Sequence, residues 1–223
     1  MSAGGAAPAA AGAADHLRAA DPVLAGLLDA LAAQGGLEIV EDPSRGGRYP
    51  VLEHYGALVR SIVGQQVSVH AARAINGRLA ERFGGRFPTP EEVLAQDPDQ
   101  LRAAVGLSRM KVVFLRSLAE HVRDGELELD RLDELDDDAV LAELVAVKGI
   151  GAWTAHMFLM FQLRRPDVLA VGDLGIRRAA ERAYGLPELP APEALTALAE
   201  PWRPHRSAAC RLLWKSLDLT PDA

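Results

Sequence analysis

Residues 141–161 read LAELVAVKGIGAWTAHMFLMF, two apolar helical segments joined by a short glycine-containing turn. We expect one helix to end near Ala146 and a second helix to begin at Ala152. Gly149 can take the positive φ that a tight turn needs, and Gly151 has no side chain to keep a ligand away from its amide. Free amides at a helix N-terminus bind a phosphate without any charged side chain.

We interpret the segment over about 138–163 as a helix–hairpin–helix motif. The amides of Gly149, Gly151 and Thr154 are expected to bind the phosphate. The Lys148 side chain either contacts a phosphate or is simply solvated. A glycine-rich connection without a ligand is the alternative for the whole motif, and the two flanking apolar helices disfavour it.

The composition is that of an ordinary globular protein, with 223 residues of which 49% are hydrophobic and 25% charged. One cysteine, Cys210, excludes a disulfide framework, a cysteine-only zinc site and a cysteine-ligated iron–sulfur cluster. No run of about 18 apolar residues is present, so we expect no membrane span. Residues 1–14 lack the basic start of a signal peptide. We therefore expect a cytoplasmic protein with a disordered tail over 1–14 and a helical domain over 15–223.

The net charge of -7 conceals an uneven distribution. Nine carboxylates and one arginine lie between Glu126 and Glu143, and the rest of the chain carries 23 basic and 22 acidic groups. A basic face that binds nucleic acid is compatible with this pattern, but charge alone favours the simpler explanation that the arginines solvate helix surfaces.

The remaining pattern is helical, with no run of strand alternation, with glycines at expected helix ends and with Ser68, Thr89, Asp97 and Ser108 at expected helix starts. The predicted helices cover about 16–33, 52–63, 69–83, 90–96, 98–105, 109–123, 137–146, 152–163, 174–184, 191–199 and 204–217, with a loop over 35–51. Short helices with short connections indicate an all-α fold.

One aspartate follows the hairpin in the segment VGDLGIRR, residues 171–178. Asp173 stands where the next helix is expected to begin, and an aspartate at that place is most often an N-cap. The combination of hairpin and aspartate gives this residue a second interpretation, because the two features together match a known arrangement.

The chain resembles the AlkA-type 3-methyladenine DNA glycosylase II family of the helix–hairpin–helix DNA glycosylase superfamily. The resemblance covers about 50–217. It rests on RSIVGQQVSVHAA (60–72), GLSRMKVVFLRSLA (106–119), VKGIGAWTAHMFLMF (147–161), DVLAVGDLGIRRA (167–179) and WRPHRSAACRLLW (202–214).

The resemblance implies a two-lobed all-α fold with a central cleft, in which double-stranded DNA binds and a damaged base is flipped out of the duplex. Asp173 matches the catalytic aspartate. Trp153 stands where bifunctional relatives carry a nucleophilic lysine, so a monofunctional glycosylase without lyase activity is implied. Its expected reaction is hydrolysis of the N-glycosidic bond of alkylated bases, in base excision repair.

Further roles follow from the same resemblance. The base pocket is expected to contain Trp153, Trp214, Met157 and Phe158, although core packing is the favoured interpretation for Phe158 and for Phe161. Gln65 and Gln66 match the loop that fills the gap left by the flipped base. Arg206 either contacts a phosphate or is solvated. Main-chain carbonyls of Val145, Val147 and Ile150 match positions that can hold a monovalent cation, and no other cofactor is implied.

Two alternatives remain open from the sequence. A glycosylase for deaminated or oxidised bases would share the fold, although oxidised-base enzymes usually carry the lysine that Trp153 replaces. A non-catalytic helix–hairpin–helix DNA-binding protein would need neither Asp173 nor an aromatic pocket.

Long bacterial members of the family carry an α/β domain before the helical core, and the roughly 50 residues that precede the core here are too few for it. We expect a monomer as the simplest state.

Overall fold

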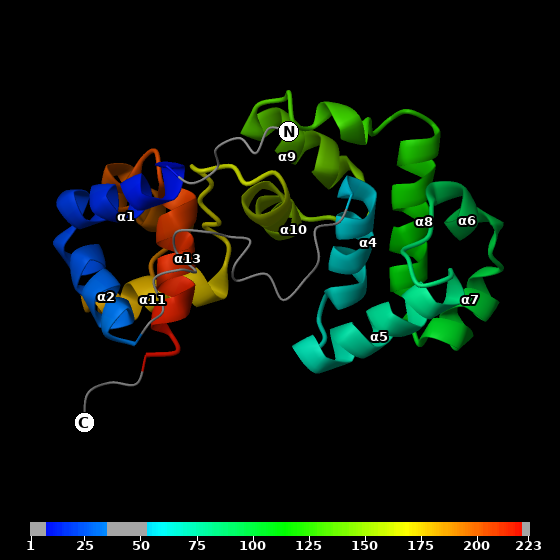
Figure 1. Cartoon of the computed structure of the whole chain (residues 1–223), viewed down its shortest axis with the longest axis horizontal. Coiled ribbons are helices and arrows are strands. Elements are labelled where there is room, and N and C mark those ends of the chain that lie inside the picture. The colour runs from blue at the N-terminus through cyan, green and yellow to red at the C-terminus, as the bar shows by residue number, and fades with distance from the viewer. Residues whose placement is uncertain (1–7, 35–52, 220–223) are drawn as a thin grey trace, which may run out of the picture. The chain divides into compact units, whose positions relative to one another are not determined.

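The structure is a computed structural model that describes residues 8–34 and 53–219. Every regular element within those two ranges is a helix, which confirms the predicted all-α class (Figure 1). The chain divides into two compact units, one over 53–158 and one that combines 8–34 with 159–219. This division agrees with the two lobes implied by the resemblance, whereas the central cleft stays a prediction.

The unit over 53–158 contains the hairpin. Its elements are α4 (His54–Gly64), α5 (Val69–Arg82), α6 (Pro90–Ala95), α7 (Pro98–Val105), α8 (Arg109–Arg123), η1 (Leu129–Arg131), α9 (Asp137–Ala146) and α10 (Ala152–Met157). Helix α8 is central to this unit because it packs against α4, α6 and α7. Leu115 and Leu118 of α8 and Ile62 of α4 are fully buried, and each such burial stabilises the fold by about 1.5–3 kcal/mol.

Side-chain caps begin these helices at positions that the sequence predicts. Ser68, Asp97 and Ser108 each accept a hydrogen bond from an amide in the first turn of the following helix. Thr89 and Glu92 form a reciprocal capping box at the start of α6. Each cap satisfies an amide that the helix cannot pair internally and contributes about 1 kcal/mol.

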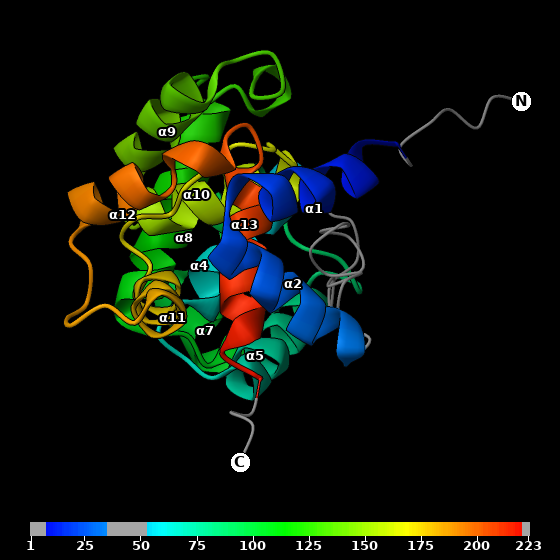
Figure 2. The same cartoon turned by 90° about the vertical axis from the view of Figure 1, so that its left-hand side faces the viewer.

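The other unit joins the two ends of the described chain. Its elements are α1 (Pro8–Ala20), α2 (Pro22–Ala33), α11 (Leu174–Tyr184), α12 (Pro192–Leu198), η3 (Glu200–Trp202) and α13 (Arg206–Ser216). Helix α13 packs against α1, α2 and α11 (Figure 2). Asp21 caps α2 and also accepts hydrogen bonds from Trp202 Nε1, 2.9 Å away, and from the Tyr184 hydroxyl. It therefore links the N-terminal helices to the C-terminal part of the chain.

The N-terminal segment differs from the expected tail. Helix α1 begins at Pro8, so residues 8–14 are helical, and Ala13 and Ala14 are buried. Alanine has the highest helix propensity of all residues, so the alanine-rich composition extends a helix here instead of a loose tail. The remaining tail residues, 1–7, and the loop expected over 35–51 lie outside the described residues.

The single helix expected over 152–163 is also interrupted. Helix α10 ends at Met157 and is followed by a π-helical turn, η2 (Phe158–Gln162), at which the chain passes from one unit to the other. A π turn winds more residues into each turn than an α-helix does, and such turns are frequent at functional sites. Residues three apart therefore no longer share a face here, as they would on an α-helix.

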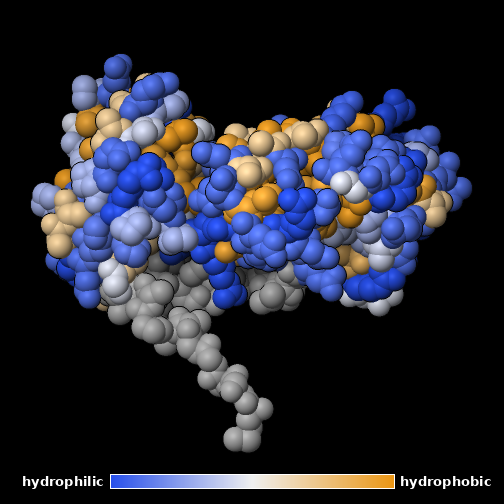
Figure 3. Space-filling view, turned by 90° about the horizontal axis from the view of Figure 1, so that it is seen from above, coloured by the Kyte–Doolittle hydropathy of each residue, from blue (hydrophilic) through white to orange (hydrophobic). Residues whose placement is uncertain are grey.

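No helix among the described residues is long and apolar enough to cross a membrane. The surface is mixed, with hydrophobic side chains emerging among hydrophilic ones (Figure 3). The large hydrophobic side chains that are exposed in the unit over 53–158 are Val67, Val69, Met110, Val113, Val145 and Trp153.

Candidate functional site

The predicted hairpin forms between α9 and α10. Val147 donates its amide to the Leu144 carbonyl at 3.2 Å, and Ile150 donates its amide to the Val147 carbonyl at 3.0 Å. Gly149 has a φ of 92°, which confirms the positive angle predicted for this turn. The side chains of Val147 and Ile150 are buried, so they anchor the turn to the helices around it.

Helix α8 supports this turn through two contacts. A Cβ added to Gly149 would lie 2.1 Å from Cγ of Phe114, so the aromatic ring fills the space beside the glycine. The Lys148 amide donates to the Ser117 hydroxyl at 3.3 Å. Gly149 is therefore required both for its backbone angle and for its contact with Phe114.

The residues expected to face a phosphate differ in exposure. Lys148 and Gly151 are exposed, and a Cβ on Gly151 would meet no atom within 4 Å. Thr154 is buried, and its hydroxyl lies 3.4 Å from Gln65 Nε2. The Thr154 side chain is thus used inside the protein, and only its amide stays a candidate for the phosphate.

The three carbonyls predicted to hold a monovalent cation belong to the same hairpin. Val145 lies in the last turn of α9, where carbonyls have no amide partner within the helix. The Val147 carbonyl accepts one hydrogen bond, from Ile150, and a carbonyl oxygen has a second lone pair. Carbonyl oxygens suit hard cations, so the donor set fits a monovalent cation, whose presence stays a prediction.

The two glutamines of the predicted gap-filling loop point in different directions. Gln65 Nε2 donates to the Gly149 carbonyl at 2.9 Å, so this side chain is turned toward the hairpin. Gln66 is exposed and has a φ of 55°, a left-handed backbone conformation that few non-glycine residues adopt. Of the two, only Gln66 presents its side chain to the outside.

Asp173 begins α11 as an N-cap, as predicted. Its Oδ1 accepts hydrogen bonds from the Ile176 amide and from Nε1 of Trp214 in α13, each at 2.8 Å. The side chain is buried. Two donors therefore fix the orientation of a carboxylate that is largely removed from bulk water.

Gly175 belongs to this arrangement, and sequence reasoning missed it. A Cβ at this position would lie 3.0 Å from Asp173 Oδ1 and 3.2 Å from Cδ1 of Trp214. The missing side chain makes room for the indole to approach the carboxylate. The only signal in the sequence is a glycine two residues after Asp173, at the start of a helix. The structure shows that this glycine does not have a positive φ.

An aromatic pair extends the site around Asp173. Phe161 stacks on Trp214 with ring centroids 6.0 Å apart and an angle of 24° between the planes. Phe161 remains 43% exposed, so the expectation that it is a core residue is wrong. The π turn is the physical reason, because it changes which residues between 158 and 162 share a face.

The other predicted pocket residues lie in or at the edge of the unit over 53–158. Phe158 is only 5% exposed and packs edge-on against the His54 ring at 5.5 Å, so it is a core residue and its assignment to the base pocket is not supported. Trp153 is 48% exposed and Met157 is half-buried. Their role in a base pocket stays a prediction.

Arg206, for which the sequence leaves phosphate contact or solvation open, forms an ion pair with Asp167. Its guanidinium donates to both oxygens of the Asp167 carboxylate, at 2.8 and 3.0 Å, and Arg203 donates to the same group at 2.8 Å. Burial acts to raise the pKa of Asp167, but the hydrogen bonds from Arg206 and the positive charges of Arg206 and Arg203 together outweigh burial, so that pKa lies below its ordinary value. Arg206 therefore takes part in an ion pair within the protein, and a phosphate contact by this residue stays a prediction.

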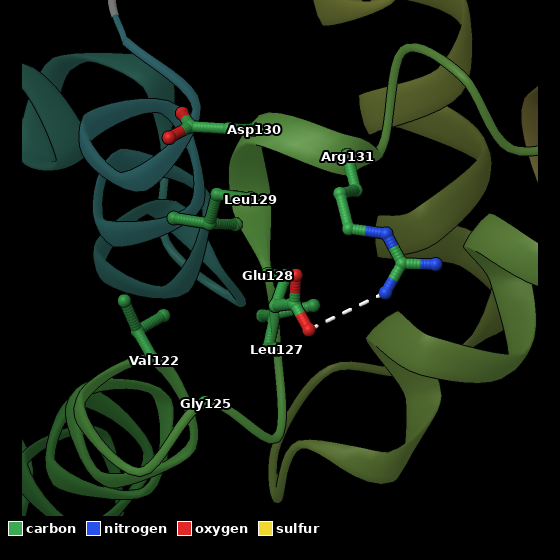
Figure 4. A pocket seen from close by; sticks show the side chains of 7 residues that line it. All are labelled: Val122, Gly125, Leu127, Glu128, Leu129, Asp130 and Arg131. Atoms are coloured by element: carbon green, nitrogen blue, oxygen red, sulfur yellow. Dashed lines mark hydrogen bonds and ion pairs between the residues drawn. The ribbon is translucent and has the colours of Figure 1, made fainter.

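A separate pocket lies in the acidic part of the chain. It is lined by Val122, Gly125, Leu127, Glu128, Leu129, Asp130 and Arg131 (Figure 4). Arg131 and Glu128, two of these lining residues, form an ion pair at 3.3 Å. None of the predicted site residues contributes to this pocket, and no group of three or more His, Cys, Asp or Glu residues that could hold a metal ion occurs among the described residues.

Comparison with known proteins places these features in a family. The family model of the HhH-GPD superfamily base excision DNA repair proteins matches residues 59–204. DNA-3-methyladenine glycosylase 1 of Schizosaccharomyces pombe is 36% identical over 169 residues, which are 75% of this chain and 74% of that protein.

Two solved structures resemble the fold closely. The 3-methyladenine DNA glycosylase of Schizosaccharomyces pombe in complex with abasic DNA has a TM-score of 0.75 and 30% identity, covering 93% of this chain and 97% of that one. The DNA-3-methyladenine glycosidase of Bacillus halodurans has a TM-score of 0.69 and 36% identity, covering 88% and 89%. The chain therefore belongs to the HhH-GPD superfamily of base excision DNA repair proteins, as a DNA glycosylase of the AlkA type.

Proposed function

We propose that this protein is a monofunctional DNA glycosylase that removes alkylated bases of the 3-methyladenine and 7-methylguanine type from double-stranded DNA, as a step of base excision repair. One observation carries the proposal. A buried carboxylate, Asp173, is held at a helix start by the indole of Trp214, and Trp214 is itself stacked on the exposed ring of Phe161. The relatives named DNA-3-methyladenine glycosylases support the class of lesion.

The chemistry requires little acid catalysis. Alkylation at N3 or N7 gives the base a positive charge, so the bond to the sugar is already weak and the base leaves without a proton donor. The barrier lies in the sugar, which becomes cationic as the bond breaks. Asp173 stabilises that cation through its fixed negative charge and can orient the attacking water. No residue in this proposal forms a Schiff base with the sugar.

Base recognition in this proposal uses aromatic faces. Phe161 and Trp214 together present a flat surface of which the phenylalanine is exposed. A positively charged purine stacks on such a surface with a cation–π contribution of about 1–2 kcal/mol once it is desolvated. A neutral, undamaged base lacks that contribution, so the pair favours alkylated over normal bases.

The unit over 53–158 would hold the DNA. Amides of the hairpin bind a backbone phosphate, and a monovalent cation on the carbonyls of Val145, Val147 and Ile150 would reduce the negative charge there. Gln66 enters the space that the flipped base leaves. We further propose that the protein acts as a monomer in the cytoplasm.

The test compares the protein with its Asp173→Asn variant on duplexes that each contain one defined alkylated, deaminated or oxidised base. We expect release of methylated purines by the parent, no release by the variant, and similar DNA affinity for both. Asp97→Asn is the matched control, because Asp97 caps α7 as Asp173 caps α11.

Three outcomes would overturn parts of this proposal. Full turnover by Asp173→Asn would remove the catalytic assignment. Release by the parent of oxidised or deaminated bases alone would replace the lesion class. DNA binding without release of any base would leave a binding protein instead of an enzyme.

A further inference from the structure

The side chain of Gln65 connects two segments that are 84 residues apart in the sequence. Gln65 is the first residue after α4 (His54–Gly64), and its carboxamide reaches the hairpin. Nε2 donates to the Gly149 carbonyl at 2.9 Å and lies 3.4 Å from the Thr154 hydroxyl. The donor is thus shared between the turn of the hairpin and the helix that follows it.

Helix α8 holds the same two segments from its own residues. Lys111 Nζ donates to the Val63 carbonyl at 2.7 Å, in the last turn of α4. Burial of Lys111 lowers its pKa from the ordinary value. Phe114, one turn further along α8, fills the space beside Gly149. The loop that follows α4 and the hairpin therefore rest on one helix, and Gln65 joins them directly.

The next residue, Gln66, has the opposite placement, because it is exposed with a φ of 55°. An uncommon backbone angle of this kind persists only where the surrounding structure fixes it. The Gln65 side chain, anchored to Gly149 and Thr154, is a fixed point directly before that angle.

We propose that Gln65 is a positioning residue that locks the Gln66 loop to the hairpin, so that gripping the DNA backbone and filling the gap in the duplex occur as one rigid movement. This inference rests on the proposed function, in which Gln66 fills the space of the flipped base. It gives the two adjacent glutamines different tasks, with Gln66 touching DNA and Gln65 acting through Gln66.

The experiment is a double-mutant cycle measured by single-turnover release of 7-methylguanine from a duplex. Gln65→Met keeps the length of the side chain and removes its N–H donors. Gln66→Ala removes the gap-filling group. Gln96→Met is the matched control, because Gln96 also follows a helix of this unit but pairs with Arg82 instead of the hairpin.

We expect Gln65→Met to slow release about tenfold, as the loss of one well-placed hydrogen bond predicts. Half-saturating DNA concentration should change little, because the hairpin amides remain. In the Gln66→Ala background the same substitution should have almost no further effect, because a positioning residue has nothing left to position. Gln96→Met should release the base at the parental rate, and thermal melting should show all variants folded.

Two results overturn the inference while the proposed function stands. The first is a Gln65→Met variant that releases the base at the parental rate. The second is a Gln65→Met substitution that slows release by the same factor in the parent and in the Gln66→Ala background. Parental release by Gln66→Ala would remove the gap-filling role of Gln66 and with it the inference, while Asp173 would still account for the chemistry. A parent protein that releases no base overturns both proposals.

Discussion

The carboxylate of Asp173 and the indole of Trp214 meet because residue 175 is a glycine. The hydrogen bond between them is 2.8 Å long, and a Cβ at residue 175 would press on both partners. The missing side chain at residue 175 therefore allows the close contact between Trp214 and Asp173. Catalytic groups must be held within fractions of an ångström of their productive positions, so small intrusions have measurable effects.

At the residue scale we predict that Gly175→Ala reduces the rate of base release about tenfold, because the added methyl displaces the indole from Asp173. The free energy of unfolding should change by less than about 1 kcal/mol. Single-turnover release and urea denaturation measure the two quantities. Gly26→Ala in α2 is the control, since a Cβ there meets no atom within 4 Å; it should keep the parental rate. An equally fast Gly175→Ala variant would show that the indole needs no fixed place.

At the element scale, the hairpin is stable because of its neighbours as much as its own sequence. Phe114 and Ser117 of α8 contact the turn, and Gln65 contacts it from the end of α4. Within the turn, different structural requirements favour glycine at positions 149 and 151. Gly149 has a positive φ and a close neighbour, whereas Gly151 has neither.

We predict that alanine substitutions distinguish a requirement for stability at Gly149 from a requirement for DNA binding at Gly151. Gly149→Ala should destabilise the protein by about 1–3 kcal/mol, because the methyl meets Phe114 and the backbone angle becomes strained. Gly151→Ala should leave the free energy of unfolding nearly unchanged and should weaken DNA binding, because the methyl blocks a phosphate from the amide. Urea denaturation and titration with a labelled duplex test both statements. Parental DNA affinity of Gly151→Ala would contradict the amide–phosphate assignment.

At the scale of the whole molecule, Asp21 joins the two ends of the described chain within one unit. Burial acts to raise the pKa of its carboxyl group, but hydrogen bonds from Tyr184, Trp202 and the amides of α2 outweigh burial, so the pKa lies below its ordinary value of 3.8. The folded state therefore favours the charged carboxylate. Its contribution to stability is complete above the unfolded value and is lost as the pH falls through the lower folded pKa.

We predict that Asp21→Asn lowers the free energy of unfolding by about 1–3 kcal/mol at neutral pH. The difference between parent and variant should shrink as the pH falls below 3.8. Urea denaturation of the full chain at several pH values measures this, and other titrating groups cancel because both proteins contain them. A difference that is constant with pH would show that charge on Asp21 plays no part.

The sequence predicts the features that depend on neighbouring residues. Ser68, Asp97 and Asp173 cap helices where expected, and Gly149 turns as expected, because a cap or a tight turn involves only a few consecutive residues. Gly175 depends instead on a contact across more than 35 residues of sequence, which no local pattern contains.

Contacts between residues that are distant in sequence also explain other placements that the sequence did not predict. Arg206 forms an ion pair with Asp167, which lies 39 residues away in the chain. The inward direction of Gln65 depends on the hairpin, and the exposure of Phe161 depends on a π turn that helical periodicity does not reveal. Residues 8–14 are helical instead of a loose tail because alanine has a high helix propensity, which overrides the tail-like composition of this segment.

The π turn over Phe158–Gln162 has a consequence for how this fold diversifies. Because the π turn winds an extra residue into the helix, deletion of one amino acid there would be expected to turn the Phe161 ring away from Trp214 even though Phe161 itself is kept. Within the proposed function, an insertion or deletion in this turn would therefore change the aromatic surface on which the damaged base stacks. Surveys that compare only substituted positions would overlook such a change.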